Sequence, residues 1–379
     1  MKYNIAVIAA GGRSRGVVGN LFKESTDIKI VSVFDPDREM CKLAKEQWNQ
    51  PDMVFCDTYQ EAIQRDDVNW VMVFSPNSFH KEHILCAFNA GKHVFSEKPL
   101  ATSIEDCQEI YEAHKKSNLQ FATGFVLRYA PLYTKVHELL EKGYIGKLLS
   151  IDANENISPD HGAYIMQNWR RFKKYAGPHI LEKCCHDLDL INWFAGSVPS
   201  YVASFAGRDF FIPENKDYDK MTHPDGRKIF GGWEDPHAAD SAFTSEKDMM
   251  DNQVAIMQYR NGIRVMFQAT VSNAIPERRM YFSGTEGTMI AELYTGILRC
   301  KRIDDGEQET IYNYSGGGGH AGGDSYIMKE LYDTMLNDTL PKCGGDEGLE
   351  SSVVAMAIEK AKDEMKVFDL EPVWKKLDR

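Results

Sequence analysis

Hydrophobic positions in the first third of the chain follow two alternating patterns. Five short apolar runs, rich in β-branched residues, are typical of strands buried on both faces; they are residues 4–10, 28–34, 68–74, 93–96 and 119–124. Between them lie stretches with the apolar spacing of helices, at residues 17–25, 36–50, 59–64, 81–90 and 103–117. Strands that alternate with helices of this length predict βαβ units, and therefore an α/β domain built on a doubly wound parallel sheet.

The pattern changes after about residue 130. One more helix is expected at 131–142, and longer strand-like stretches follow at 147–157, 198–206, 253–260, 263–272, 278–283, 288–292 and 297–302. Hairpin signals such as Asn261-Gly262 join several of them. Two helices are expected near the end, at 323–337 and 347–363. We therefore divide the chain into an N-terminal domain, 1–125, and an α+β domain, 126–379, with a large, mainly antiparallel sheet.

Residues 207–250 fit neither pattern. They are polar and rich in Gly, Pro and Asp. A connection of this length is uncommon unless it is functional or lies at an interface.

Composition and charge narrow the classes of function. The chain has 379 residues, of which 43% are hydrophobic and 26% are charged, as in soluble globular proteins. No run reaches the roughly eighteen apolar residues of a membrane span, and the net charge of −12 disfavours nucleic acid and anionic membranes. The eight cysteines form no C-x-x-C pair, so neither a disulfide scaffold nor a metal site is expected, and a cytoplasmic location fits best.

A glycine-rich turn follows the first predicted strand. Gly11 and Gly12 let the backbone approach a pyrophosphate, and the helix after the turn would present its amide groups to the phosphates. Asp35, at the end of the next strand, is placed to accept hydrogen bonds from an adenosine ribose. The negative charge of Asp35 should repel the 2′-phosphate of NADP and so favours NAD, whereas Arg38 could bind that phosphate and leaves NADP as the alternative. The G-x-G-x-x-G fingerprint is matched only in part, because Ala9 takes its first position, so an ordinary βα turn remains the alternative.

Further short motifs follow in order along the chain. They are Ser75-Pro76-Asn77 with His80, Glu97-Lys98-Pro99, Gly124-Phe125 with Arg128-Tyr129, Ile145-Gly146-Lys147, Trp169-Arg170, Gly177 through His186 and Asp189, Asp251-Asn252, and Gly322-Gly323-Asp324. Taken together, they resemble the Gfo/Idh/MocA oxidoreductase family. The resemblance implies a Rossmann domain, an open-faced C-terminal sheet, NAD or NADP, a sugar or polyol substrate and a homo-oligomer, either a dimer or a tetramer.

The turn and the resemblance together give a set of expected site residues. Cofactor contacts are expected from Gly11, Gly12, Arg13, Ser14, Asp35, Arg38, Ser75, Asn77, His80, Glu97 and Lys98. Substrate contacts are expected from Arg128, Trp169, Arg170 and His186, with Tyr129, His320 and Asp324 as further candidates.

Lys98 is the expected catalytic residue of the N-terminal domain. It lies at the carboxyl end of a predicted strand, where open α/β sheets bind their ligands. Its ammonium group can hydrogen-bond the hydroxyl that is oxidised and stabilise the developing alkoxide. Pro99 restricts Lys98 to an extended backbone. The alternative is an ordinary surface lysine after a strand.

A second catalytic pair is expected in the other domain. Glu182 and His186 are four residues apart, so they share one face if a single helix carries them. The imidazole of His186 can take and return a proton near neutral pH, and Glu182 can orient it or bind a hydroxyl. Members of the family often have Asp where this chain has Glu182. A histidine bonded to a backbone carbonyl is one alternative; metal binding with Cys184 and Cys185 is disfavoured, because consecutive helical residues point apart.

Three functions fit these residues. The first is hydride transfer between a hydroxyl-bearing carbon of a sugar or polyol and a nicotinamide cofactor. The second is an NAD-dependent glycosidase that acts by transient oxidation and elimination and produces no net NADH. The third, an NAD-binding regulator, would need Gly11 and Asp35 but not both Lys98 and His186. We therefore expect an enzyme, with the dehydrogenase as the leading hypothesis.

Overall fold

The computed structural model describes residues 3–233, 235, 237–314 and 319–379. The chain forms two compact units, Met1–Ala130 with Gly318–Ser352, and Pro131–Gly317 with Val353–Arg379. The first unit thus combines the N-terminal residues with a late segment of the chain. In the part of the chain that the structure describes, no helix is both long enough and apolar enough to cross a bilayer.

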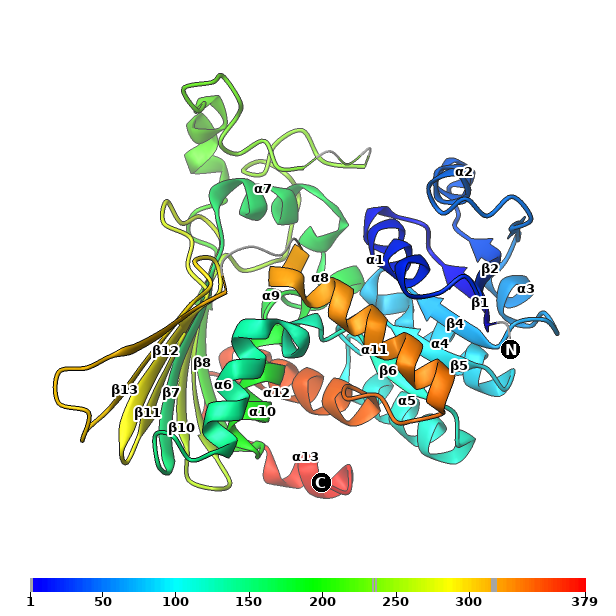
Figure 1. Ribbon diagram of the computed structural model, residues 1–379. Coiled ribbons are helices and arrows are strands. Elements are labelled where there is room, and N and C mark those ends of the chain that lie inside the picture. The colour runs from blue at the N-terminus through cyan, green and yellow to red at the C-terminus, as the bar shows by residue number, and fades with distance from the viewer. Residues whose placement is uncertain (1–2, 234, 236, 315–318) are drawn as a thin grey trace. The chain divides into compact units, whose positions relative to one another are not determined.

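The first unit is built on a six-stranded parallel sheet (Figure 1). Its strands follow the order β3-β2-β1-β4-β5-β6 and are β1 (Tyr3–Ile8), β2 (Ile28–Phe34), β3 (Val54–Phe55), β4 (Trp70–Val73), β5 (His93–Ser96) and β6 (Phe121–Thr123). The side chains from Ile5 to Ile8 are completely buried, as the continuous apolar run predicted. The strand order reverses between β1 and β4, so the predicted doubly wound sheet is confirmed.

Helices accompany the strands of this unit. They are α1 (Gly12–Glu24), α2 (Arg38–Gln47), α3 (Tyr59–Ile63), α4 (His80–Asn89), α5 (Ile104–Ser117) and α11 (Gly323–Asn337). Side-chain caps fix the first residue of three of these helices. The side chains of Asp37, Thr58 and Ser103 accept backbone N–H groups of the first turns of α2, α3 and α5. α1 packs against α11, which comes from the other end of the chain.

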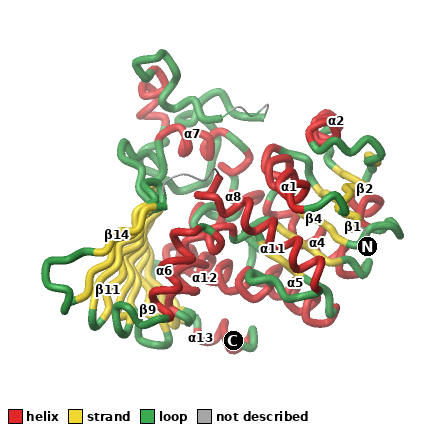
Figure 2. Tube along the Cα trace, viewed as in Figure 1, coloured by secondary structure: helices red, strands yellow, loops and turns green. Residues whose placement is uncertain are grey.

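The second unit contains a nine-stranded sheet, yellow in Figure 2. In the order β14-β13-β12-β11-β7-β10-β9-β8-β15, only β7 and β10 pair in parallel. The strands are β7 (Leu148–Asn156), β8 (Pro199–Gly207), β9 (Asn252–Tyr259), β10 (Arg264–Thr270), β11 (Arg279–Gly284), β12 (Gly287–Glu292), β13 (Ile297–Arg302), β14 (Thr310–Asn313) and β15 (Phe368–Asp369). The expected large, mainly antiparallel sheet is confirmed.

The two faces of this sheet differ. α6 (Pro131–Glu141) and α10 (Cys185–Ala195) pack on one face (Figure 1). Along β9 every second side chain is buried and those between are exposed, because successive side chains of a strand point to opposite faces. The exposed positions of β9 and of its neighbours β8 and β10 include the large apolar side chains of Phe205, Val254, Ile256 and Met266. One face of the sheet is therefore open and apolar.

The sequence predicted no elements for residues 207–250, and those of them that the structure describes form a compact insertion. Its apolar residues pack against α7 (Pro159–Gln167) in a core that includes Ile165, Met166, Phe211, Phe230, Ala242, Phe243 and Met249. Asp251 anchors the start of the insertion, because its carboxylate accepts the backbone N–H groups of Asp209, Phe210 and Phe211 at 2.8–2.9 Å. These contacts make the segment an ordered, packed part of the second unit.

Several short elements also differ from the sequence prediction. α7, α8 (Lys173–Ala176), α9 (His179–Glu182), α13 (Glu371–Lys376), β3, β14 and β15 were not predicted. α12 (Gly345–Glu364) lies close to its predicted place and contributes residues to both units.

Candidate functional site

The glycine turn after β1 forms the start of α1. Gly11 is the N-cap residue, and a Cβ added to Gly11 or Gly12 would meet no atom within 4 Å. No side chain caps this helix start, so its first amide groups remain available to an anion. Ala9 has φ 71°, a left-handed conformation that explains why the fingerprint has glycine there. The predicted helix start at residue 17 was too late, because the glycines lie within the first turn.

Asp35 links the ends of β1 and β2. Its Oδ2 accepts the N–H of Ala10 at 2.8 Å, and its Oδ1 accepts the N–H of Asp37 at 2.8 Å. Burial raises the pKa of Asp35, and this effect outweighs the two hydrogen bonds, which lower the pKa. Arg38 is paired with Asp57 on the surface. The carboxylate thus lies beside the glycine turn, as a ribose-binding group requires, while the guanidinium of Arg38 is engaged elsewhere.

Arg13 connects the glycine turn to two other segments of the first unit. Its Nε donates to Glu97 Oε1 at 2.6 Å, and its Nη1 donates to Asp324 Oδ1 at 2.8 Å. His320 Nδ1 lies 3.1 Å from the other oxygen of Asp324. Burial raises the pKa of Asp324, but the hydrogen bonds and charges of His320 and Arg13 outweigh burial and lower the pKa to about 2. The sequence candidates Arg13, Glu97 and Asp324 therefore form one ion-pair network.

The ends of β4 and β5 are joined by a buried histidine. His80 Nδ1 lies 2.8 Å from the carbonyl oxygen of Pro99, and His80 Nε2 lies 2.9 Å from that of Ser75. Burial lowers the pKa of His80, so the neutral ring donates to one carbonyl at a time. Lys98, half-buried between Glu97 and Pro99, is thus held at the carboxyl end of β5. Asn77 is buried at the start of the short helix after β4.

Arg128 and Tyr129 lie together in a short helix, Val126–Tyr129, of the same unit. Tyr129 Oη donates to Glu330 at 2.6 Å, and the Arg128 guanidinium lies 3.7 Å from Glu347. These contacts fix both side chains against the late segment of the first unit.

In the second unit, Glu182 pairs with Arg170. Arg170 Nε donates to Glu182 Oε1 at 2.8 Å, and its Nη1 donates to Tyr164 Oη at 2.8 Å. The guanidinium also lies 4.3 Å from the ring centroid of Trp169. Three residues that the sequence proposed for substrate binding or catalysis are therefore neighbours, and Tyr164 is an additional member that it did not single out.

Glu182 and His186 do not share one continuous helix. Glu182 ends α9, whereas the buried His186 belongs to α10, which begins at Cys185. The break falls at Lys183 and Cys184. The condition for a shared helix face, a single helix that carries both residues, is therefore not met, because α10 starts anew at Cys185.

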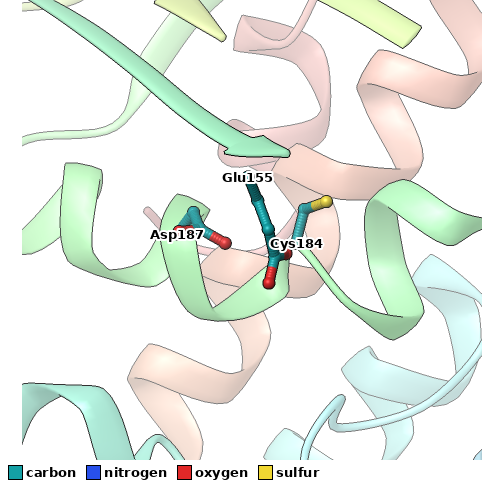
Figure 3. A group of neighbouring side chains, drawn as sticks. All are labelled: Glu155, Cys184 and Asp187. Carbon is teal, nitrogen blue, oxygen red and sulfur yellow. The ribbon is translucent and has the colours of Figure 1, made fainter. Parts of the chain in front are cut away.

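A buried charged cluster lies at the start of α10 (Figure 3). The thiol of Cys184 and the carboxylates of Glu155 and Asp187 offer ligand atoms within 4.8 Å of one another. Arg278 already neutralises the carboxylates: it donates to Asp187 at 2.8 and 2.7 Å and lies 3.2 Å from Glu155. Because a guanidinium occupies the position of a cation, we assign this cluster to structure and not to a metal.

Comparisons with known proteins identify the relationship. Residues 3–125 match an oxidoreductase family with an NAD-binding Rossmann fold, and residues 137–369 match the C-terminal α/β domain of the same family. The chain belongs to the Gfo/Idh/MocA oxidoreductase family. Residues 3–125 are accordingly an NAD-binding Rossmann domain, as the resemblance implied.

Relatives of the chain include an inositol dehydrogenase and an anhydrofructose reductase. Inositol 2-dehydrogenase of Gluconacetobacter diazotrophicus is 31% identical over 197 residues, which cover 51% of this chain and 54% of the relative. The 1,5-anhydro-D-fructose reductase of Ensifer adhaerens is 23% identical over 315 residues, or 80% of each chain. A structure of levoglucosan dehydrogenase in complex with NADH and levoglucosan matches with a TM-score of 0.80 at 17% identity, covering 98% of this chain and 100% of that one. The structural likeness establishes a shared fold.

Proposed function

We propose that the chain is an NAD-dependent dehydrogenase that oxidises a hydroxyl-bearing carbon of a sugar or polyol. The observation that carries the proposal is the position of Lys98 at the carboxyl end of β5, in a sheet whose glycine turn fits a pyrophosphate. Glu97 beside it is bound to Arg13 of that turn. The relatives named above support a polyhydroxylated ring as the substrate.

The residues of the chain would bind the substrate and move its proton. NAD, when bound, supplies the hydride acceptor. Lys98 donates a hydrogen bond to the reacting oxygen and stabilises its negative charge. His186 accepts the hydroxyl proton, since imidazole exchanges protons near neutral pH. Glu182 and Arg170, held together at 2.8 Å, offer an acceptor and donors to neighbouring hydroxyl groups.

We propose NAD as the preferred cofactor. The carboxylate of Asp35 accepts ribose hydroxyl groups and repels a 2′-phosphate. Arg38, which could attract that phosphate, is paired with Asp57.

We also propose a homo-oligomer formed through the open face of the nine-stranded sheet. Phe205, Ile256 and Met266 are 62%, 59% and 55% exposed on that face. Contiguous apolar surface of this kind marks an interaction site. A reducing, cytoplasmic location fits the eight free thiols.

The test is an assay of purified protein with NAD or NADP and a panel of sugars, inositols and glycosides. Net NADH, followed by its absorbance, is expected with at least one sugar or polyol. Release of an aglycone without net NADH would instead indicate the glycosidase. Absence of both reactions would contradict the proposed enzyme class.

A further inference from the structure

An exposed aromatic cluster lies in the second unit. Trp233, in the 207–250 insertion, is 49% exposed and is the most exposed of the six tryptophans of the chain. Its ring centroid lies 4.4 Å from that of Tyr164 and 4.6 Å from that of His161, with interplanar angles of 37° and 41°. We call these three residues the aromatic platform. About half of the indole surface is thus open to the apolar face of a ligand, with polar groups beside it.

The backbone holds Trp233 in this position. Gly232 has φ +67°, and a Cβ on it would lie 3.1 Å from both Cα and N of Tyr164, so glycine allows the insertion to run this close to α7. The N–H of Ala239 donates to the carbonyl of Gln167 at 2.8 Å, and Ser245 Oγ donates to that of Met166 at 2.7 Å. The insertion is thus tied to the helix that carries the other two rings.

The platform continues into the proposed substrate-binding residues. Arg170 donates to Tyr164 Oη on one side and to Glu182 on the other, each at 2.8 Å, so one guanidinium separates the platform from Glu182. Burial, helped by the nearby Lys183 ammonium, lowers the pKa of His161 to about 3. His161 is therefore neutral at physiological pH and offers one donor and one acceptor.

A pyranose ring requires this combination of surfaces. Its C–H groups form an apolar face that packs on an aromatic ring, and its hydroxyl groups need donors and acceptors at the edge of that ring. We propose that the aromatic platform is a subsite for a second sugar ring, so that the substrate is a disaccharide or larger glycoside. This inference rests on the proposed function, since it takes the ligand beside Glu182 to be a sugar.

The test compares monosaccharides with disaccharides that contain them. Glucose is paired with maltose and cellobiose, and galactose with melibiose and lactose. Xylose and rhamnose are each paired with a disaccharide that contains the same sugar. Saturation-transfer NMR in the presence of NADH measures Kd for wild type and Trp233→Ala. We expect at least one disaccharide to bind wild type about tenfold more tightly than its monosaccharide, the scale of one aromatic contact. Trp233→Ala should abolish that preference and leave the Kd of the monosaccharide and of NADH unchanged.

Two further variants separate stacking from loss of structure. Trp233→Phe keeps an aromatic ring and should retain part of the preference. Tyr218→Ala truncates another half-exposed aromatic residue of the insertion, one that packs on Phe210 and Phe230, and should leave the preference unchanged.

Three results would overturn the subsite: no disaccharide preferred by wild type, equal weakening of both ligands in Trp233→Ala, or weakened NADH binding in that variant. The proposed function fails separately, through the absence of net NADH with every sugar. A disaccharide preference that depends on Trp233 would support the subsite even in that case, because binding is measured without turnover.

Discussion

Replacing Asp35 with asparagine tests the assignment of the cofactor site. The two carboxylate oxygens of Asp35 accept the N–H groups of Ala10 and Asp37, both at 2.8 Å, so the charge is fixed at the end of β2. Asparagine keeps one oxygen as an acceptor for Ala10 and removes the charge. The change therefore removes the charge that separates NAD from NADP, together with the acceptor of the Asp37 N–H.

The expected magnitude follows from Coulomb's law. At an effective dielectric constant of about 20, the carboxylate repels a unit negative charge of the 2′-phosphate, about 6 Å away, by about 3 kcal/mol. Because Asp35 is partly exposed, solvent reduces this repulsion, and a gain of about tenfold in NADP affinity is expected. NAD loses a hydrogen bond to a charged group, which is worth about 1.5–3 kcal/mol or at least about tenfold. The ratio of the two dissociation constants should therefore shift by about a hundredfold toward NADP.

Fluorescence titrations with NADH and NADPH measure this ratio. Asp57→Asn is the companion variant, because it frees Arg38 to attract the 2′-phosphate. Asp57 is 83% exposed and its ion pair with Arg38 is therefore weak, so the ratio should shift toward NADP by less than about fivefold. Wild type that binds NADPH more tightly than NADH, or an unchanged ratio in Asp35→Asn, would refute the reasoning.

Three other substitutions probe catalysis and stability. His186→Ala should lower kcat by about a hundredfold and remove the pH dependence of kcat near neutrality, because no imidazole remains to accept the proton; a pH–rate profile that keeps its acidic limb contradicts this role. Glu182→Gln should raise KM more than it lowers kcat, since the charge-assisted hydrogen bond from Arg170 is weakened; an unchanged KM would argue against substrate contact. His83→Gln should flatten the acid side of the stability curve. Burial lowers the pKa of His83 to about 3 from 6.5, so the unfolded chain binds a proton that the folded state resists. Wild type should then lose up to about 1.4 kcal/mol per pH unit as pH falls below the unfolded pKa, until the folded pKa is reached. Urea unfolding between about pH 7 and pH 5 measures the slope, and equal slopes in the two proteins would exclude His83 as its source.

The architecture could be predicted from the sequence because long apolar patterns determine it. The continuous runs ending before Gly11, Asp35 and Ser75 correspond to β1, β2 and β4, which form the centre of the parallel sheet. Alternating exposure along β9 and β10 likewise follows the apolar pattern of a half-buried sheet.

The contacts within the candidate sites could not be predicted in the same way. Arg13 contacts Asp324, more than three hundred residues away, and no local pattern encodes that pair. The break between α9 and α10 is invisible to a four-residue spacing, which fits one helix or two. Trp233 meets Tyr164 only because a polar, glycine-rich segment folds back on α7. Such features depend on tertiary packing, whereas periodicity reports local structure.

Net NADH formation by wild type and by Lys98→Met tests the central proposal most directly. The assay supplies NAD and the sugar and polyol panel, and Lys116→Met, which alters an exposed lysine of α5, is the matched control. We predict net NADH with at least one sugar or polyol in wild type and in the control. Lys98→Met should keep much of its affinity for NAD, yet turn over at least about a hundredfold more slowly, because the charged donor at the reacting oxygen is lost. Near-normal turnover by Lys98→Met, or wild type that forms no net NADH with any member of the panel, would contradict the account.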